Sequence, residues 1–309
     1  PVIRNSAKKT SKQMRWWHWI IGAGCVGGIG VVAATIAWPI GASETEISLA
    51  GDVERGSYLA RASGCIACHT HFESGGAPLA GGAPLKTDFG TFYPPNLTTD
   101  AEHGMGNWTV ADFAKAVRQG ISPDGDPYYP TFTYPFYANF TDQDIADLWA
   151  AFQTVPAVNV PAPAHDVPFP FDQRWGMKLW RAAFLTEPFT APEADKSDVW
   201  NRGKQLVNGA AHCSACHTTR NVVGARIVAE RFSGNDALPG GGKAPSIRSG
   251  DLLSEGWTVD DLAYALRSGI TPSGDVFGGS MAEVVRYGTS FLSDADLTAM
   301  ATYLMDNDI

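Results

Sequence analysis

Apolar residues recur at helical spacing in two parts of the chain that lie about 150 residues apart. In the first part, Phe113, Ala116 and Val117 would share one face of a helix over residues 112–118. In the second part, the same kind of spacing holds for Leu262, Tyr264, Ala265 and Leu266. The pattern therefore predicts two similar amphipathic helices, one in each half of the chain.

The residues that flank both segments are typical of helix ends. Thr109 and Thr258 precede the apolar positions, where a side-chain oxygen can accept from a free backbone N–H group. Gly120 and Gly269 follow the last apolar positions, where a left-handed backbone often ends a helix. Both helices are therefore predicted to begin after a threonine and to end at a glycine.

The similarity between the halves extends along most of the chain. Trp108-Thr109-Val110-Ala111-Asp112-Phe113 aligns with Trp257-Thr258-Val259-Asp260-Asp261-Leu262, and Thr141-Asp142-Gln143-Asp144 parallels Ser293-Asp294-Ala295-Asp296. Thr141 and Ser293 are predicted to cap the last helix of each copy. We therefore predict two copies of one domain, at residues 44–154 and 196–309. The Pro-rich segment 155–195 is predicted to be a linker that contains one short helix within 173–184.

An uncharged segment precedes both copies. Residues 16–43 carry no formal charge, and a bilayer-spanning helix needs about 20 apolar residues. Residues 1–15 are basic, whereas Glu44 and Glu46 follow the segment. By the positive-inside rule, we predict a single transmembrane anchor at 16–43 in a bacterial inner membrane, with residues 1–15 in the cytoplasm and the rest in the periplasm. Cys25 is interpreted as a packing residue, with an acylated lipoprotein cysteine as the alternative.

The balance of charges excludes one class of partner. The net charge is −9, and the part that follows the basic N-terminus is more acidic still. Because nucleic-acid binding requires a positive surface, no nucleic-acid partner is expected. An acidic surface can serve solubility, or it can dock a basic redox protein.

Two cysteine motifs supply the chemistry. Cys65-Ile66-Ala67-Cys68-His69 and Cys213-Ser214-Ala215-Cys216-His217 are both C-x-x-C-H, one in each copy. In this motif the two thiols bond to one haem and the histidine takes an axial position on its iron. A zinc site would need a second ligand cluster, which the remaining Cys25 and the scattered histidines do not form. Two covalently bound haem c groups are therefore predicted.

Further segments resemble a known family. They are Tyr58-Leu59-Ala60-Arg61-Ala62, Ala80-Gly81-Gly82, Phe89-Gly90-Thr91, Pro95-Asn96-Leu97-Thr98, Gly106-Asn107-Trp108-Thr109, Gln173-Arg174-Trp175 and Trp200-Asn201-Arg202-Gly203. With the two motifs, they make the chain similar to the membrane-bound multihaem cytochrome c subunits of bacterial periplasmic alcohol, gluconate and aldehyde dehydrogenases. The resemblance implies an all-α fold of two tandem class I cytochrome c domains, here added to the predicted transmembrane helix. The alcohol dehydrogenase type has three haem motifs, whereas this chain has two.

The second iron ligand of each haem is less evident. In the second copy, Met281 follows a Gly-containing loop and is predicted to join His217, since a class I cytochrome c supplies its thioether there. Its alternative role is core packing. In the first copy, the matching position holds Phe132, which cannot bind iron. Met177 of the linker is the favoured partner of His69, followed by Met105 and then by a vacant iron position.

Trp108 and Trp257 occupy matching positions behind Gly-rich loops. Each can donate its indole N–H group to a haem propionate, or pack against the ring without a hydrogen bond. The sequence leaves both interpretations open.

Electron transfer is the function that these features favour. Neither a Ser-His-Asp set, a phosphate-binding loop nor a pair of catalytic carboxylates is evident in the sequence. The expected donor is a periplasmic dehydrogenase subunit, and the expected acceptor is quinone, a soluble cytochrome or an oxidase. One alternative is a haem enzyme of the peroxidase or thiosulfate dehydrogenase type with an open first haem. Another is the haem subunit of a terminal oxidase complex.

Overall fold

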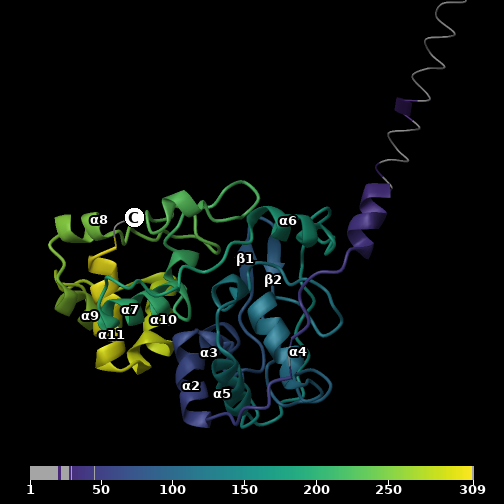
Figure 1. Ribbon diagram of the computed structural model, residues 1–309, viewed down its shortest axis with the longest axis horizontal. Helices are drawn as coiled ribbons and strands as arrows, with labels where there is room; N and C mark the ends of the chain where they lie inside the picture. The colour runs from purple at the N-terminus through teal and green to yellow at the C-terminus, as the bar shows by residue number, and fades with distance from the viewer. Residues whose placement is uncertain (1–19, 22–27, 29, 45, 308–309) are drawn as a thin grey trace, which may run out of the picture.

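The computed structural model describes residues 20–21, 28, 30–44 and 46–307. The first copy contains α2 (Val53–Ala62), α3 (Cys65–Cys68), η1 (Phe72–Ser74), β1 (Leu85–Thr87), β2 (Gly90–Phe92), α4 (Val110–Ala114), η2 (Lys115–Gln119), η3 (Tyr134–Phe136) and α5 (Asp142–Phe152). The linker contributes α6 (Gly176–Phe184). The second copy contains α7 (Asp198–Asn208), η4 (Cys213–Ala215), η5 (Val228–Glu230), α8 (Ser249–Ser254), α9 (Val259–Ser268), α10 (Gly279–Tyr287), η6 (Thr289–Phe291) and α11 (Asp294–Met305). Figure 1 shows the two copies side by side, with α6 at one end of the first.

The first and last helices of each copy cross at a glycine. A Cβ atom at Gly56 of α2 would overlap the carbonyl oxygen of Asp147 in α5. At the corresponding place in the second copy, a Cβ atom at Gly203 of α7 would overlap the carbonyl oxygen of Ala299 in α11. Because only glycine lets the two backbones approach this closely, both crossings depend on it.

The predicted helix ends are confirmed. Thr109 forms a capping box with Asp112 at the start of α4, and Thr258 accepts from the backbone N–H of Asp261 at the start of α9. Gly120 and Gly269 end these helices with φ of 62° and 75°. The first helix differs from the expectation in one respect, because after Ala114 it continues through η2 as a wider π-helical turn.

The caps of the last helices are confirmed as well. Thr141 forms a capping box with Asp144 at the start of α5. Ser293 accepts from the backbone N–H of Asp296 at the start of α11. The linker helix predicted within 173–184 is α6.

Each copy has its own hydrophobic core. The first core gathers Phe113, Ile145, Leu148 and Phe152 between α4 and α5. The second core gathers Trp200, Leu206, Leu262, Leu297 and Met300 from α7, α9 and α11. Ala62 of α2 belongs to the second core, so the first helix of one copy also helps to bury the other.

Polar contacts join the same two regions. The hydroxyl of Tyr58 in α2 donates to Asp296 Oδ2 in α11 at 2.7 Å and accepts from the backbone N–H of Ser293 at 3.0 Å. The guanidinium of Arg61 lies 4.1 Å from the ring centroid of Phe291. The two copies are therefore packed together through α2 rather than connected by the linker alone.

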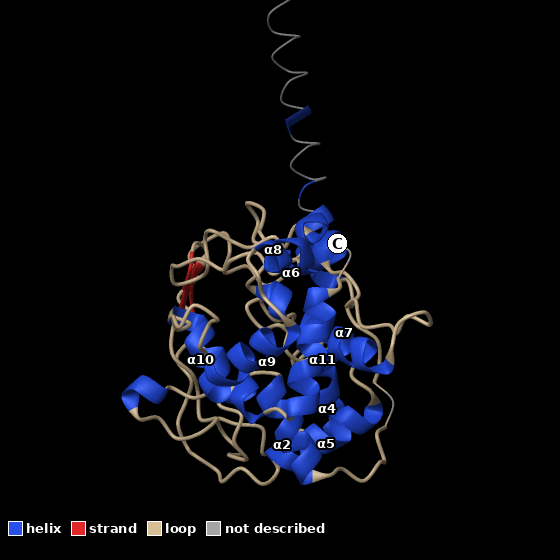
Figure 2. Cartoon of the chain, turned by 90° about the vertical axis from the view of Figure 1, so that its left-hand side faces the viewer, coloured by secondary structure: helices blue, strands red, loops and turns tan. Residues whose placement is uncertain are grey.

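The purely α-helical class needs one correction. Strands β1 and β2 form a small antiparallel hairpin in which Leu85 pairs with Phe92 and Thr87 with Gly90 (Figure 2). Thr87 stabilises the turn, since its hydroxyl donates to the carbonyl of Gly90 and accepts from the N–H of Phe89. Strands of three residues carry too short an alternation of polar and apolar positions to be read from sequence.

The predicted transmembrane helix is also corrected. In the described part of the chain, no helix has both the length and the apolar character needed to cross a membrane. Residues 30–37 are helical, but this conformation stops before Trp38-Pro39 because a residue that precedes proline disfavours the helical region. The predicted cytoplasmic segment 1–15, Cys25 and residues 16–19, 22–27 and 29 of the predicted anchor lie outside the described residues.

The helical residues 30–37 are fastened to the linker. The ammonium group of Lys178 in α6 donates to the carbonyl oxygens of Ile36 at 2.6 Å and Trp38 at 2.8 Å. A cation at the C-terminal end of a helix satisfies carbonyl groups that have no intrahelical partner. Figure 1 shows this helical segment leaving the body beside α6.

Candidate cofactor attachment sites

The first C-x-x-C-H motif forms a single helical turn. Gly64 has a left-handed backbone with φ of 66° and caps α3, which spans Cys65–Cys68. The turn places His69 directly after it, where the imidazole Nδ1 lies 2.8 Å from the carbonyl oxygen of Pro95. This contact fixes the ring and leaves Nε2 for another partner.

The second motif repeats this geometry. His212 has a left-handed backbone with φ of 40° and caps η4, which spans Cys213–Ala215. The Nδ1 atom of His217 lies 2.7 Å from the carbonyl oxygen of Pro245. Both motif histidines are therefore held by a proline carbonyl, with Nε2 available in the same way.

Burial controls the protonation of these histidines. It lowers the pKa of His69 to about 4, against the opposing effect of the Pro95 carbonyl. Burial also lowers the pKa of His217, against the carbonyl of Pro245. A neutral imidazole is the form that binds a metal ion, so both rings are in the required state at neutral pH.

The thiols of the two motifs are free, and burial affects their protonation. The four motif cysteines form no disulfide, and Cys68 and Cys216 are exposed. Burial nevertheless raises the pKa of Cys68 to about 11 and that of Cys65 to about 12. At neutral pH both thiols of the first motif are therefore protonated.

The arrangement fits haem c and not a metal ion held by protein ligands alone. Within residues 46–307, no three His, Cys, Asp or Glu side chains are grouped so that they could hold an ion. Each motif instead offers two free thiols and one oriented imidazole, the set that haem c requires. In haem c, the two cysteines of each motif would form the thioether bonds and His69 or His217 would bind the iron.

The two motifs lie next to each other in space. The nearest heavy atom to a Cβ built at Gly64 is Cε1 of His212, at 3.7 Å. Tyr137 donates its hydroxyl to the carbonyl of Ser63 at 2.9 Å, and its ring centroid lies 5.9 Å from that of His212. Ala215 of the second motif belongs to the same buried cluster as this tyrosine. The first turns of both attachment segments are thus in contact through Gly64, Tyr137 and His212.

The remaining predicted site residues have varied surroundings. Met281 is partly buried in α10 and packs against the second core, as does Trp257. The indole N–H of Trp257 donates to Glu255 Oε2 at 3.3 Å, and Trp108 packs against the first core. Met105 is 3% exposed within that core. The roles of these four residues stay predictions.

Met177 lies on α6, which faces the loop that contains Phe132. Arg174, three residues earlier, donates to the carbonyl of Pro127 at 3.1 Å. Arg181, four residues later, places its guanidinium 5.0 Å from the ring centroid of Tyr134. Met177 and Arg181 are four residues apart on α6 and therefore share one helix face, whereas Arg174 precedes the helix.

Sequence reasoning missed several residues of the site. Tyr137, His212, Arg220 and Arg226 all contact one of the motifs or their neighbours. His212 is adjacent to Cys213 and Arg220 follows His217 by three residues, so proximity to the motif was the available signal. Tyr137 and Arg226 carry no such signal. The folding of a loop within the second copy brings Arg226 to Ser214, and the packing of the two copies brings Tyr137 to His212.

Comparison with known proteins agrees with this geometry. The cytochrome c family profile matches residues 53–152. A diheme cytochrome c-type protein of Cereibacter sphaeroides is 41% identical over 264 residues, which cover 83% of this chain and 86% of that protein.

Other relatives are subunits of named enzymes. The cytochrome c subunit of a quinone alcohol dehydrogenase from Gluconobacter oxydans is 43% identical over 82% of this chain and 54% of that protein. The cytochrome c subunit of gluconate 2-dehydrogenase from Pantoea cypripedii is 39% identical over 82% of this chain and 58% of that protein. The chain thus spans little more than half the length of these two relatives.

Proposed function

Since the chain belongs to the cytochrome c family that includes the diheme cytochrome and the dehydrogenase subunits above, we propose that it relays electrons between two covalently bound haems. When bound, each haem supplies a one-electron ferric–ferrous couple. The chain's own part is to hold the two groups close together. The contact of the two attachment segments through Gly64, Tyr137 and His212 is the observation that carries this function.

We propose a dehydrogenase subunit as the electron donor, on the periplasmic side of the inner membrane. The named relatives are subunits of alcohol, gluconate and fructose dehydrogenases, which supports a donor of this class. Quinone, a soluble cytochrome or an oxidase is the proposed acceptor. The acidic net charge of −9 favours a basic docking surface on whichever protein partner is used.

We propose His217 and Met281 as the axial ligands of the second haem. Met281 lies in the first turn of α10 beside the second core, and a partly buried thioether there is positioned by packing rather than by a hydrogen bond. For the first haem we propose His69 and Met177. Arg174 contacts Pro127 and Arg181 contacts Tyr134, so α6 is held against the chain on either side of Phe132. This arrangement supports the pairing.

A second candidate function follows from Phe132. This ring stands where the second copy has Met281, and it packs against Tyr128, Tyr134 and Tyr137 at centroid distances of 5.9, 6.0 and 6.1 Å. If neither Met177 nor Met105 binds the first iron, that iron would have an open position and the chain would be a haem enzyme of the peroxidase or thiosulfate dehydrogenase type.

The deciding experiment uses the protein purified in mild detergent together with its bound partner. Pyridine haemochrome analysis should give two haems per chain, and haem staining should survive denaturing electrophoresis. Adding the substrate of the co-purified dehydrogenase should reduce both haems. A single haem per chain, or haems that react with peroxide or thiosulfate but accept no electrons from a dehydrogenase, would overturn the relay.

A further inference from the structure

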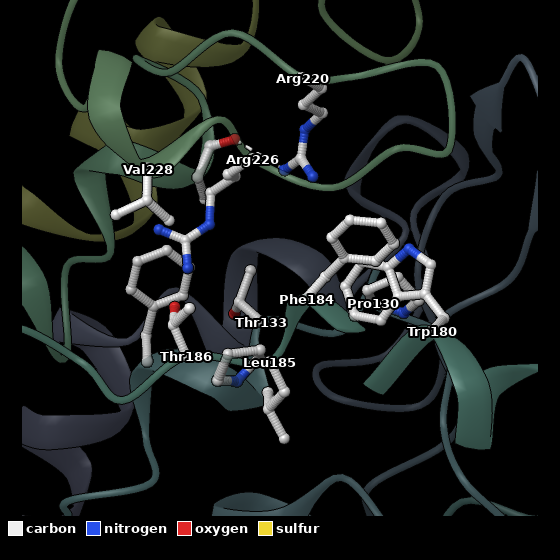
Figure 3. Close-up of a pocket in the computed structure, with 12 residues that line it drawn as sticks. Pro130, Thr133, Trp180, Phe184, Leu185, Thr186, Arg220, Arg226 and Val228 are labelled. Carbon is white, nitrogen blue, oxygen red and sulfur yellow. Dashed lines mark hydrogen bonds between the residues drawn. The ribbon is translucent and has the colours of Figure 1, made fainter. Parts of the chain in front are cut away.

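Two arginines bind the segment between the cysteines of the second motif. The guanidinium of Arg220 donates to the carbonyl oxygen of Ala215 at 2.8 Å, and that of Arg226 donates to Ser214 Oγ at 2.9 Å. Ser214 and Ala215 are the two residues between Cys213 and Cys216. Figure 3 shows Arg220 and Arg226 on one side of a pocket, with the dashed line marking the bond from Arg220. Both positive charges therefore lie beside the residues that separate the two attachment cysteines of the second motif.

These charges have no carboxylate partner. Among the ion pairs of the described residues, none includes Arg220, Arg226 or the neighbouring Arg231. Arg226 instead lies 4.2 Å from the ring centroid of Phe136, and the Nε atom of Arg220 is buried without a hydrogen-bond partner. Each guanidinium thus keeps its full charge in a partly dehydrated environment, where electrostatic effects are stronger than in water.

Burial and the neighbouring positive charges both lower the pKa of Arg226. Burial lowers the pKa of Arg226 to about 10, and the nearby charges of Arg220 and Arg231 lower it further in the same direction. A group with this pKa is still protonated at neutral pH. The second site is therefore in a permanent positive field.

The first motif has no comparable arginine contact in the described part of the chain. Among the hydrogen bonds of residues 46–307, none runs from an arginine to the segment 65–69. The two otherwise similar motifs thus differ in the charge beside them.

We propose that Arg220 and Arg226 make the second haem the acceptor of the pair, so that electrons pass from the first motif to the second. A positive charge favours the reduced state of a nearby redox centre, and a negative charge favours the oxidised state. The exchange is one electron, lost by the first site and gained by the second, with no bond or proton transferred. This inference rests on the proposed relay and adds its direction.

The test is a spectroelectrochemical titration of the holoprotein with both haems attached. Arg220→Gln and Arg226→Gln should each make the higher-potential haem harder to reduce, by about tenfold in its reduction equilibrium constant, which is 59 mV for one electron. The lower potential should stay in place.

Two controls separate charge from structure. Arg226→Lys keeps the positive charge and should restore most of the potential, whereas a purely structural role would make it behave like Arg226→Gln. Arg267→Gln removes an arginine of the same copy that pairs with Asp294 at 2.6 Å, and it should leave both potentials unchanged.

Two results would overturn the proposal. One is a shift of the lower potential by Arg220→Gln and Arg226→Gln, and the other is an absence of any shift in both variants. Neither result depends on a dehydrogenase, since the titration uses chemical mediators. A failure of the relay itself would appear only in the substrate-driven reduction described above.

Discussion

At the residue scale, the two copies differ most clearly at Phe132 and Met281. Comparison of the two halves of the sequence alone identified this difference, because Phe132 and Met281 each lie six residues after the matching Asp126 and Asp275. The structure adds that Phe132 lies among tyrosines, while Met281 lies at the start of a helix. The two haems are therefore expected to have different partners opposite their histidines.

Met281→Ala should remove the thioether from the second haem. We expect the near-infrared band of methionine-to-iron charge transfer to disappear for that haem, while both haems stay covalently attached. Near-infrared absorption of the oxidised protein checks this. An unchanged band would show that Met281 only fills space in the core.

Met177→Leu tests the first haem in the same way. The variant keeps an apolar side chain of similar volume, so α6 should stay in place while one haem becomes high-spin and binds carbon monoxide. Absorption spectra with and without carbon monoxide give the answer. Met105→Leu is the matched control, and a fully low-spin Met177→Leu protein would exclude Met177 as the ligand.

Asp147 gives a pH dependence to the first helix crossing. Hydrogen bonds from Arg55 lower its pKa to about 2, and further bonds come from the N–H of Asp52 and from Gln143. A depressed pKa in the folded state stabilises the fold above the unfolded value of about 3.9, and this stabilisation is lost as the pH falls through about 2.

Asp147→Asn should therefore lower the free energy of unfolding at pH 6, with a deficit that shrinks between pH 4 and pH 2. Urea unfolding at several pH values measures it. Asp236→Asn removes an exposed carboxylate and should have little effect at any pH. A deficit that is the same at pH 6 and pH 2 would contradict the assigned role of the Asp147 charge.

At the scale of elements, local sequence signals were sufficient wherever the structure is local. The caps at Thr109, Thr141, Thr258 and Ser293 were predictable because each uses a side chain to bond the backbone three residues on. The hairpin of β1 and β2 was not, since its strands are short and its turn depends on Thr87. The positions of Arg220 and Arg226 beside the second motif depend on how their loop folds. The hydrophobic periodicity of the sequence does not predict the conformation of a loop.

Gly203→Ala should destabilise the crossing of α7 and α11. The new methyl group overlaps the carbonyl oxygen of Ala299, and forcing the helices apart costs about 1–3 kcal/mol. Gly250→Ala in α8 is the control, because no atom lies within 4 Å of the added Cβ and the change should be neutral or slightly stabilising. Thermal unfolding compares the two, and equal stability would show that the helices adjust without cost.

At the scale of the whole molecule, the packing of the two copies was not readable from the sequence. The sequence repeat predicted two similar units and a linker. It did not predict the contact between the units, because Tyr58 and Arg61, which make that contact, are not part of the repeated segments. The proposed boundaries at 44–154 and 196–309 stay predictions. The predicted membrane-spanning helix illustrates the opposite error, since an apolar composition does not by itself give an uninterrupted helix across Trp38-Pro39.

Tyr58→Phe should weaken the contact between the copies. The change removes the hydroxyl that bonds Asp296 and leaves the N–H of Ser293 without its partner, at a cost of about 1–3 kcal/mol. We expect one calorimetric transition for the natural protein and two overlapping transitions for the variant. Tyr264→Phe, at an exposed tyrosine of the second copy, should leave the profile unchanged.

The bond of Lys178 to the end of the N-terminal helical segment has a mechanical consequence. Lys178 and Trp38 are 140 residues apart in sequence, and the first copy lies between them along the chain. The two ends of that long loop meet at one point. A force that pulls on residues 30–37 therefore acts on α6 as well as on the chain that follows Trp38. These two hydrogen bonds thus divide a mechanical load on the N-terminal helical segment between the linker helix and the first copy.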